Sequence, residues 1–404
     1  MRQSHYTLKG KDVHERAGHL LQKHLGLVDY GRKCKVTVML HVLFFAASRL
    51  ISIHAACQRL KEAPSDSAMF KALLATLPGY AELQRRVNQA LMGNVPKRLR
   101  QQLQRLAVDL TLIPYHGQPL VDPKEVYRSL AKSGTSHFHA YASLYVVCRG
   151  QRFTVALTPV EKGEAMSVVV KRLLQQAAKA GIRPRLLLLD RGFYSIDVIR
   201  YLHCARVPFL MPAIARGRKP KKGQAATGIR AFQIRKKGGW GQHTLTRAKG
   251  TPRRVTVSIC VYCGNYRGKW KRHGRFAWVY AYWGIRPSST RWVADTYRTR
   301  FGIETSYRQM NQARIRTCTR DPLLRFLFVA IALILRNVWV WYHWEVLASP
   351  RRGARLLQLE RLRFETMMIW LLHVAEAVLG VADEVPTQRP PEPPVMTTAE
   401  RERT

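Results

Sequence analysis

The sequence is poor in acidic residues, and this scarcity constrains what the protein can do. Its 404 residues include only 25 Asp and Glu against 68 Lys and Arg, which gives a formal net charge of +43. A soluble protein with so much positive charge repels itself unless it binds a polyanion. We therefore expect DNA, RNA or an anionic membrane surface as a partner. A ribosome-like or merely cationic protein is the alternative.

Long apolar runs and cysteine frameworks are missing as well. The longest charge-free apolar run near the C-terminus is Phe326 to Leu335. It is shorter than the roughly 20 residues that span a bilayer. The N-terminal segment lacks the apolar region of a signal peptide. The seven cysteines are scattered, as is typical of reduced thiols. These absences predict a cytoplasmic protein without a membrane partner.

Hydrophobic residues make up 47% of the chain, so cores can form. Helical periodicity predicts an all-α region from about residue 9 to 106, including one apolar stripe from Val36 to Leu60. Three strand-like runs, a helix, a strand, a helix and a strand then indicate an α/β domain. The predicted domains are a helical DNA-binding domain at 1–104, a first part of the core at 105–211, a β-rich basic insertion at 212–290, a second part with C-terminal helices at 291–382, and a disordered tail at 383–404.

The insertion belongs to a stretch without any carboxylate. After Asp197 no Asp or Glu occurs until Asp295. A surface that lies along phosphates benefits from such an absence, because an acidic side chain there would repel them. We interpret Asp197 itself as a residue of the first turn of a helix that Ser195 caps.

Two aspartates occur where strands are predicted. Asp109 interrupts an otherwise apolar strand in VDLTLIPY, and Asp190 ends the run LLLLD. Open α/β sheets bind ligands at the carboxyl ends of their parallel strands. Each aspartate thus predicts a functional site. The alternatives are an edge-strand polar residue for Asp109 and a turn former for Asp190.

A third carboxylate occurs on a polar helix face. With 100° per residue, Tyr297, Arg300, Glu304, Arg308 and Asn311 share one stripe of a helix predicted from about residue 290 to 316. One carboxylate among such side chains suits a metal ligand beside phosphate-binding groups. The alternative is a solvated face on which Glu304 pairs with Arg300 and Arg308.

These three segments resemble the motifs of the IS4-like DDE transposases. Tyr297-x2-Arg300-x3-Glu304-x6-Asn311 is similar to the family's Y-x2-R-x3-E-x6-K signature, with Asn311 in place of the lysine. Asp190-Arg191-Gly192-Phe193 resembles the motif around the second aspartate of the family, and the segment from Asp109 to Gly117 resembles the block around the first. The departure at Asn311 leaves Arg308 or Arg314 to supply the missing cation.

The resemblance implies an RNase H-like catalytic domain interrupted by a β-rich insertion. It implies that Asp109, Asp190 and Glu304 are catalytic and bind Mg²⁺, with Mn²⁺ as a substitute. A pair of such ions about 4 Å apart activates the attacking oxygen and stabilises the leaving oxygen in phosphodiester cleavage. It also implies DNA contacts by Tyr297 and Arg300 near the cleaved end, and a tryptophan of the insertion that stacks on a flipped base. The DNA-binding residues that we expect are Tyr297, Arg300, Arg308, Asn311, Trp240, Trp270 and Arg191. For each tryptophan the alternative is the core of the insertion.

The implied partners are double-stranded DNA, namely terminal inverted repeats and target DNA, and a second copy of the chain in a homodimer on DNA. The implied location is the nucleoid of a prokaryotic cytoplasm, and the implied reaction is cut-and-paste transposition. A nuclease without strand transfer and a non-catalytic DNA-binding protein derived from a transposase are the alternatives. Intact carboxylates at all three positions argue against the latter.

Overall fold

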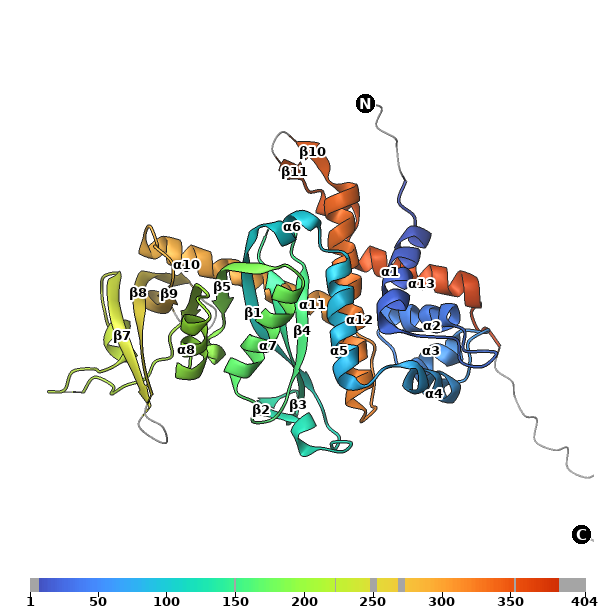
Figure 1. Ribbon diagram of the computed structural model, residues 1–404, viewed down its shortest axis with the longest axis horizontal. Helices are drawn as coiled ribbons and strands as arrows, with labels where there is room; N and C mark the ends of the chain where they lie inside the picture. The colour runs from blue at the N-terminus through green and yellow to red at the C-terminus, as the bar shows by residue number, and fades with distance from the viewer. Residues whose placement is uncertain are drawn as a thin grey trace, which may run out of the picture.

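The protein consists of a helical region, a central α/β region and a sheet that extends away from both (Figure 1). The computed structural model describes residues 7–148, 150–221, 223–247, 253–267, 273–351 and 354–384. Residue Trp270, predicted to stack on a base, and most of the predicted tail lie outside these ranges. Mixed α/β architecture with helices at the N-terminus is confirmed.

A nine-stranded mixed sheet forms the centre of the molecule. Its strand order is β2-β3-β1-β5-β6-β9-β8-β7, and β4 also pairs with β3. Strands β1, β5 and β6 run parallel, while the pairings of β3 with β1, β2 and β4 and those of β9 with β6 and β8 are antiparallel. The bounds are β1 Leu103–Pro114, β2 Tyr127–Lys132, β3 Thr135–Val146, β4 Thr154–Val160, β5 Arg183–Leu189, β6 Phe209–Pro212, β7 Gly239–Arg247, β8 Arg253–Arg267 and β9 His273–Trp283.

Helices cover both faces of this sheet. Helices α7 (Met166–Lys179) and α8 (Ile196–Cys204) connect β4 to β5 and β5 to β6, and they bury apolar side chains on one face. Helices α10 (Thr290–Arg298) and α11 (Gly302–Asn311) cover the opposite face, where Ala107 and Leu188 are buried. Burial on both sides explains why β5 is a continuous apolar run in the sequence.

The basic insertion extends the same sheet instead of forming a separate one. Strand β9 pairs with β6, and β8 and β7 follow outward, while a short helix α9 (Ile229–Gln233) precedes them. Asp197 of α8 pairs with Arg247 at 3.0 Å and also with Arg253. The prediction that Ser195 caps α8, with Asp197 in its first turn, is confirmed: the Ser195 hydroxyl accepts from the Val198 amide. In addition, Asp197 ties the insertion to α8.

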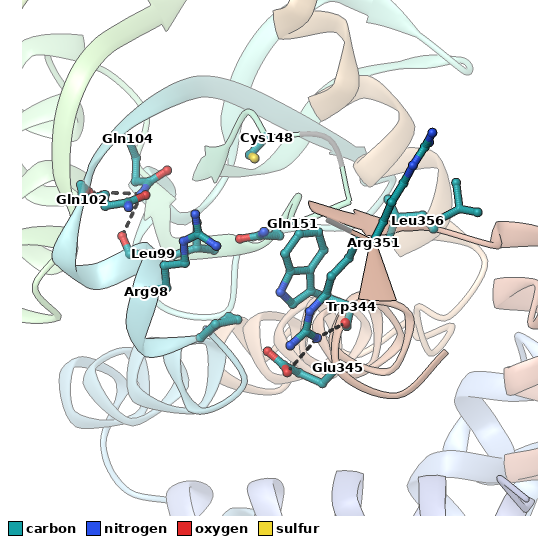
Figure 2. A pocket seen from close by; sticks show the side chains of 13 residues that line it. Arg98, Leu99, Gln102, Gln104, Cys148, Gln151, Trp344, Glu345, Arg351 and Leu356 are labelled. Carbon is teal, nitrogen blue, oxygen red and sulfur yellow. Dashed lines mark hydrogen bonds and ion pairs between the residues drawn. The ribbon is translucent and has the colours of Figure 1, made fainter. Parts of the chain in front are cut away.

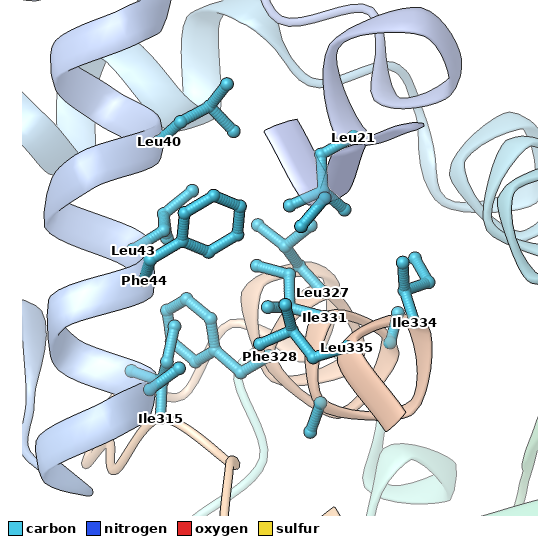
Figure 3. Packing of buried hydrophobic residues seen from close by; sticks show 14 of the residues in the cluster. Leu21, Leu40, Leu43, Phe44, Ile315, Leu327, Phe328, Ile331, Ile334 and Leu335 are labelled. Atoms are coloured by element: carbon cyan, nitrogen blue, oxygen red, sulfur yellow. The ribbon is translucent and has the colours of Figure 1, made fainter. Parts of the chain in front are cut away.

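The helical region combines both ends of the chain in one core (Figure 3). Leu21, Leu43 and Phe44 from the N-terminal helices meet Leu327 and Ile331 of α12. The N-terminal helices therefore share a core with residues assigned to the second part of the catalytic region. The bounds are α1 Gly10–Leu25, α2 Val36–Arg49, α3 Ile53–Arg59, α4 Asp66–Thr76, α5 Tyr80–Gly93, α6 Lys97–Gln101, α12 Pro322–Trp341 and α13 Phe364–Leu379.

Several predicted helix boundaries were wrong. The stripe predicted from Val36 to Leu60 divides at Leu50, which adopts a left-handed conformation with φ 55°. The helix predicted to reach residue 316 ends at Asn311 and contains a 3₁₀ turn, Thr299–Phe301. The last helix begins at Phe364, and before it β10 (Ser349–Arg351) and β11 (Ala354–Leu356) form an antiparallel pair that was not predicted.

Helix α12 is long and apolar enough to cross a membrane by length and composition when it is counted through its terminal π turn to Leu347. However, 89% of its most apolar window is buried inside the protein. The bent pair α2 and α3 passes the same test only when it is counted as one span. A central core helix has the same composition.

Candidate active site

The three predicted carboxylates come from separate segments of the chain. Asp109 lies within β1, and Asp190 directly follows β5. Because Val108 pairs with Leu189 in the parallel β1–β5 register, the two aspartates are neighbours across the strands. Glu304 lies in the first turn of α11. The sheet and the helix together bring one carboxylate from each segment to the same place.

Arg300 joins these carboxylates. Its Nη1 lies 3.0 Å from Asp109 Oδ2, and its Nη2 lies 3.5 Å from Asp190 Oδ1 and 3.3 Å from Glu304 Oε1. The Arg300 side chain is only 5% exposed, whereas those of Asp190 and Glu304 are 44% and 49% exposed. One buried guanidinium thus faces three carboxylates, and the cluster retains an excess of negative charge.

Burial has opposing effects on the charges in this cluster. It raises the pKa of Asp109, and the nearby Arg300 charge works in the opposite direction. For Arg300, burial lowers the pKa, but Tyr297, Asp109 and Asp190 together raise it above the usual value. Asp109 therefore depends on Arg300 to remain ionised, because the aspartate is the most buried of the three acids.

Tyr307 holds β1 in place beside the cluster. Its hydroxyl donates to the backbone carbonyl of Asp109 at 2.9 Å and lies 2.8 Å from the Ser143 hydroxyl. Ser143 is directly opposite Asp109 in the β1–β3 register. The sequence analysis missed Tyr307, although its position three residues after Glu304 put it on the adjacent turn of the helix.

The donor chemistry of the cluster fits a divalent metal ion. Carboxylate oxygens are the protein ligands that Mg²⁺ prefers, and three of them already converge on one cation. Within the ranges that the structure describes, no three His, Cys, Asp or Glu side chains are close enough together to hold a metal ion. The guanidinium of Arg300 lies between the carboxylates, so a metal ion would compete with it for their oxygens.

A family model for the transposase DDE domain matches residues 100–338. The chain belongs to this family. No curated protein matches the chain. The matched range of the transposase domain runs from α6 into α12 and includes all three carboxylates. Membership in the family indicates transposase activity, action on DNA and a divalent metal cofactor.

A cavity of about 540 Å³ opens beside Asp190 in the transposase domain. Its walls are rich in aromatic and cationic side chains. Tyr262 and Trp278 form one side, with ring centroids 5.8 Å apart. The remaining lining residues that matter here are Arg191, Tyr280, Tyr297, Arg298, Arg300 and Phe301. An unstacked base would find aromatic faces and cations there.

The predicted DNA-binding residues divide into buried and exposed groups. Tyr297 and Arg300 are 6% and 4% exposed. In this conformation they therefore support the site from within and contribute little to its surface. Arg191, Arg308 and Asn311 are exposed. Of the ion pairs in the alternative interpretation of this helix face, the one between Glu304 and Arg300 is present.

Trp240, predicted to stack on a base, lies on the edge strand of the insertion. Trp240 is 44% exposed on β7 and packs edge-on against Tyr282 at 5.9 Å, and it does not line the aromatic cavity beside Asp190. Trp278 occupies that place. Trp278 was not predicted from the sequence, because the run Phe276–Trp283 has the pattern of an ordinary strand.

Burial distinguishes Arg308 from Arg314, the two arginines proposed to replace the lysine of the signature. Arg314 is turned toward the protein, where burial and the charge of Arg316 lower its pKa to about 10. Arg308 remains exposed on α11, one turn beyond Glu304. Of the two alternatives, Arg308 is the more exposed.

Proposed function

We propose that the protein is an IS4-like transposase that cuts the ends of a mobile element and joins them to target DNA. The observation that carries this proposal is the convergence of Asp109, Asp190 and Glu304 on the buried Arg300 guanidinium. In an acid-poor, cationic protein, three carboxylates from separate segments meet at this one guanidinium. Such a cluster suits divalent cations better than phosphate, and phosphodiester cleavage requires both.

We assign the roles of metal ligands to Asp109, Asp190 and Glu304, which would hold Mg²⁺ or Mn²⁺. The bound ions supply an activated attacking oxygen and neutralise charge on the leaving oxygen. Arg300 and Tyr307 position the carboxylates, and Arg308 binds a phosphate next to them. The arrangement of β1, β3 and β4 followed by the parallel β5 and β6 supports an RNase H-like core.

The proposed reaction has two phosphoryl transfers. In the first, water attacks a phosphorus atom at the element end, the bond to the 3′ oxygen breaks, and that oxygen takes up a proton. In the second, the released 3′-hydroxyl attacks a phosphodiester of the target, loses its proton and forms a new ester, while the target's own 3′ oxygen leaves. Bond number is conserved in the second transfer, so no further energy source is required.

We propose that the aromatic cavity holds a base displaced from the end of the duplex. Unstacking a base costs a few kcal/mol, and an aromatic platform returns about 1–3 kcal/mol. Trp278 and Tyr262 are the platform in this proposal, in place of Trp240. The cavity's position next to Asp190 supports it, because the displaced base would belong to the nucleotide at the cleaved bond.

We also propose that two copies act together on a pair of inverted ends. A homodimer and a pair of inverted ends both have two-fold symmetry. A complex whose mass corresponds to two subunits and two ends is the expected result. A single subunit on a pair of ends would contradict it.

The triad can be tested with Asp109→Asn, Asp190→Asn and Glu304→Gln. Each substitution keeps the size of the side chain and removes its charge, so each variant should lose cleavage of end DNA by several orders of magnitude while binding it within several-fold. Asp295→Asn is the matched control, because Asp295 is exposed on α10 and pairs only with Arg291 and Arg298 among the described residues.

A second assay separates transposase from nuclease. Pre-nicked end DNA that already carries a 3′-hydroxyl is incubated with labelled target DNA, and joined products are counted. The proposal expects joining by the wild type and the Asp295→Asn control. Cleavage without joining would identify a nuclease, and unchanged cleavage in a triad variant would remove that residue from the site.

A further inference from the structure

A second cavity, of about 950 Å³, lies away from the carboxylates (Figure 2). It separates the start of β1 and α6 from the β10–β11 hairpin. Arg98, Gln151 and Trp344 face the same space, and Arg351 stands at its rim. The family match ends before the hairpin, so the family does not account for this cavity.

The charge of this cavity is one-sided. Arg98, Arg351 and Arg355 line it, and Glu345 is the single acid among its lining residues in the described chain. Glu345 is already paired with Arg355 at 3.0 Å. Arg98 and Arg351 are exposed and keep their charge available for a ligand.

Further arginines extend the positive charge toward the sheet. The Cys148 thiol lines the cavity. Burial raises the pKa of Cys148, while the charges of Arg152, Arg105 and Arg98 act in the opposite direction. The charges of these arginines reach the wall of the cavity at Cys148, where Arg98 is the one of the three that lines it.

The neutral lining groups fit a sugar–phosphate backbone. Gln102 and Gln151 add side-chain amides, which together with arginine make many of the contacts that proteins form with DNA phosphates. Trp344 supplies a flat ring beside Arg355, whose guanidinium carbon lies 5.4 Å from the ring centroid. The cavity is an open groove with cations, amides and one ring.

The groove has a defined separation from the carboxylates. Gln104 at its edge and Asp109 are five residues apart on β1, which corresponds to roughly 17 Å in an extended strand. Side chains alternate along a strand, so Arg105 points to the same face as Asp109. A duplex with about 3.4 Å per base pair would cover this separation in about five base pairs.

We propose that this groove, lined by Arg98, Gln102, Gln151, Arg351 and Arg355, binds the backbone of duplex DNA about five base pairs from the cleaved bond. The binding of a duplex here is independent of catalysis, and only its distance from the cleaved bond rests on the proposed function. Strands β10 and β11 lie outside the matched transposase domain. In this proposal they contact the DNA and hold it in position along β1.

The test combines Arg98→Gln with Arg351→Gln, both at exposed positions where the core is unaffected. Affinity for a duplex is measured by fluorescence anisotropy over a salt series. Each lost phosphate contact should reduce the slope of log K against log salt by about one, so the double variant should lose about two. The matched control is Lys171→Gln, an exposed cation on α7 that does not line the cavity. Equal slopes in the variant and the control would overturn the proposal.

A second measurement uses the wild-type chain. Saturating duplex DNA should slow alkylation of Cys148, followed by peptide mass spectrometry, and an unchanged rate would overturn the proposal. A slope change seen with single-stranded RNA but not with the duplex would overturn the choice of ligand. If the wild type did not cleave end DNA but the double variant still differed from the control in slope, the proposed transposase function would be rejected. The proposal that the groove binds duplex DNA would stand.

Discussion

At the scale of single residues, Arg300 links the charge of the site to its geometry. The guanidinium neutralises part of the repulsion among the three carboxylates and occupies the space between them. A neutral side chain there would leave Asp109 buried beside two other acids. The ionisation of Asp109 thus depends on a residue that the sequence pattern suggested only as a DNA contact.

Arg300→Gln should make cleavage more sensitive to acid. The pKa of Asp109 is already raised by burial and lowered in part by Arg300. Removal of the guanidinium raises it further, so Asp109 becomes protonated at a higher pH and the acidic limb of the rate profile moves upward in pH. The profile of kcat/KM checks this, with Arg291→Gln, exposed on α10 and outside the cavity beside Asp190, as the control. An acidic limb at the wild-type position would show that Arg300 does not control Asp109.

At the scale of elements, α12 holds the helical region and the sheet together. Asn337 donates to the carbonyls of Leu91 and Thr154 at 3.0 and 2.7 Å and accepts from the Thr154 amide at 3.0 Å. One buried side chain therefore joins α5, β4 and α12. The sequence predicted a buried apolar helix here, but the role of Asn337 depends on partners far away in the chain.

Asn337→Leu should destabilise the protein without touching the carboxylates. It leaves three buried backbone groups without a partner, each costing about 1–3 kcal/mol. We expect the free energy of unfolding in urea to fall by about 3 kcal/mol or more. Gln175→Leu, at an exposed position of α7, should change it by less than about 0.5 kcal/mol. Equal unfolding midpoints for the two variants would contradict this role.

The sequence was informative for elements whose patterns are local. The run before Asp190 and the alternation around Asp109 predicted β5 and β1, because burial on one or both faces is visible in the order of residues. The break at Leu50 and the hairpin at residues 349–356 were missed, since a left-handed residue without glycine and a short hairpin leave weak local signals. Trp278 and Tyr307 were missed because their roles arise only from strand register and helix packing.

At the scale of the whole molecule, the positively charged surfaces and the cluster of carboxylates occupy different places. The stretch from Asp197 to Asp295 without any carboxylate forms β6 to β9 and borders the aromatic cavity. The arginine groove lies at the other end of β1. Between them lie the three carboxylates. DNA can thus contact positive surfaces on two sides of the site that we propose binds metal ions.

The most direct measurement of the central claim is a change of metal specificity at Asp190. In Asp190→Cys a thiolate replaces one carboxylate, and Mg²⁺ binds sulfur poorly whereas Mn²⁺ accepts it more readily. The account predicts that this variant fails to cleave end DNA with Mg²⁺ and regains part of the cleavage with Mn²⁺, while Asp190→Ala stays inactive with both ions. Cleavage by Asp190→Cys with Mg²⁺ at the wild-type rate would contradict the account.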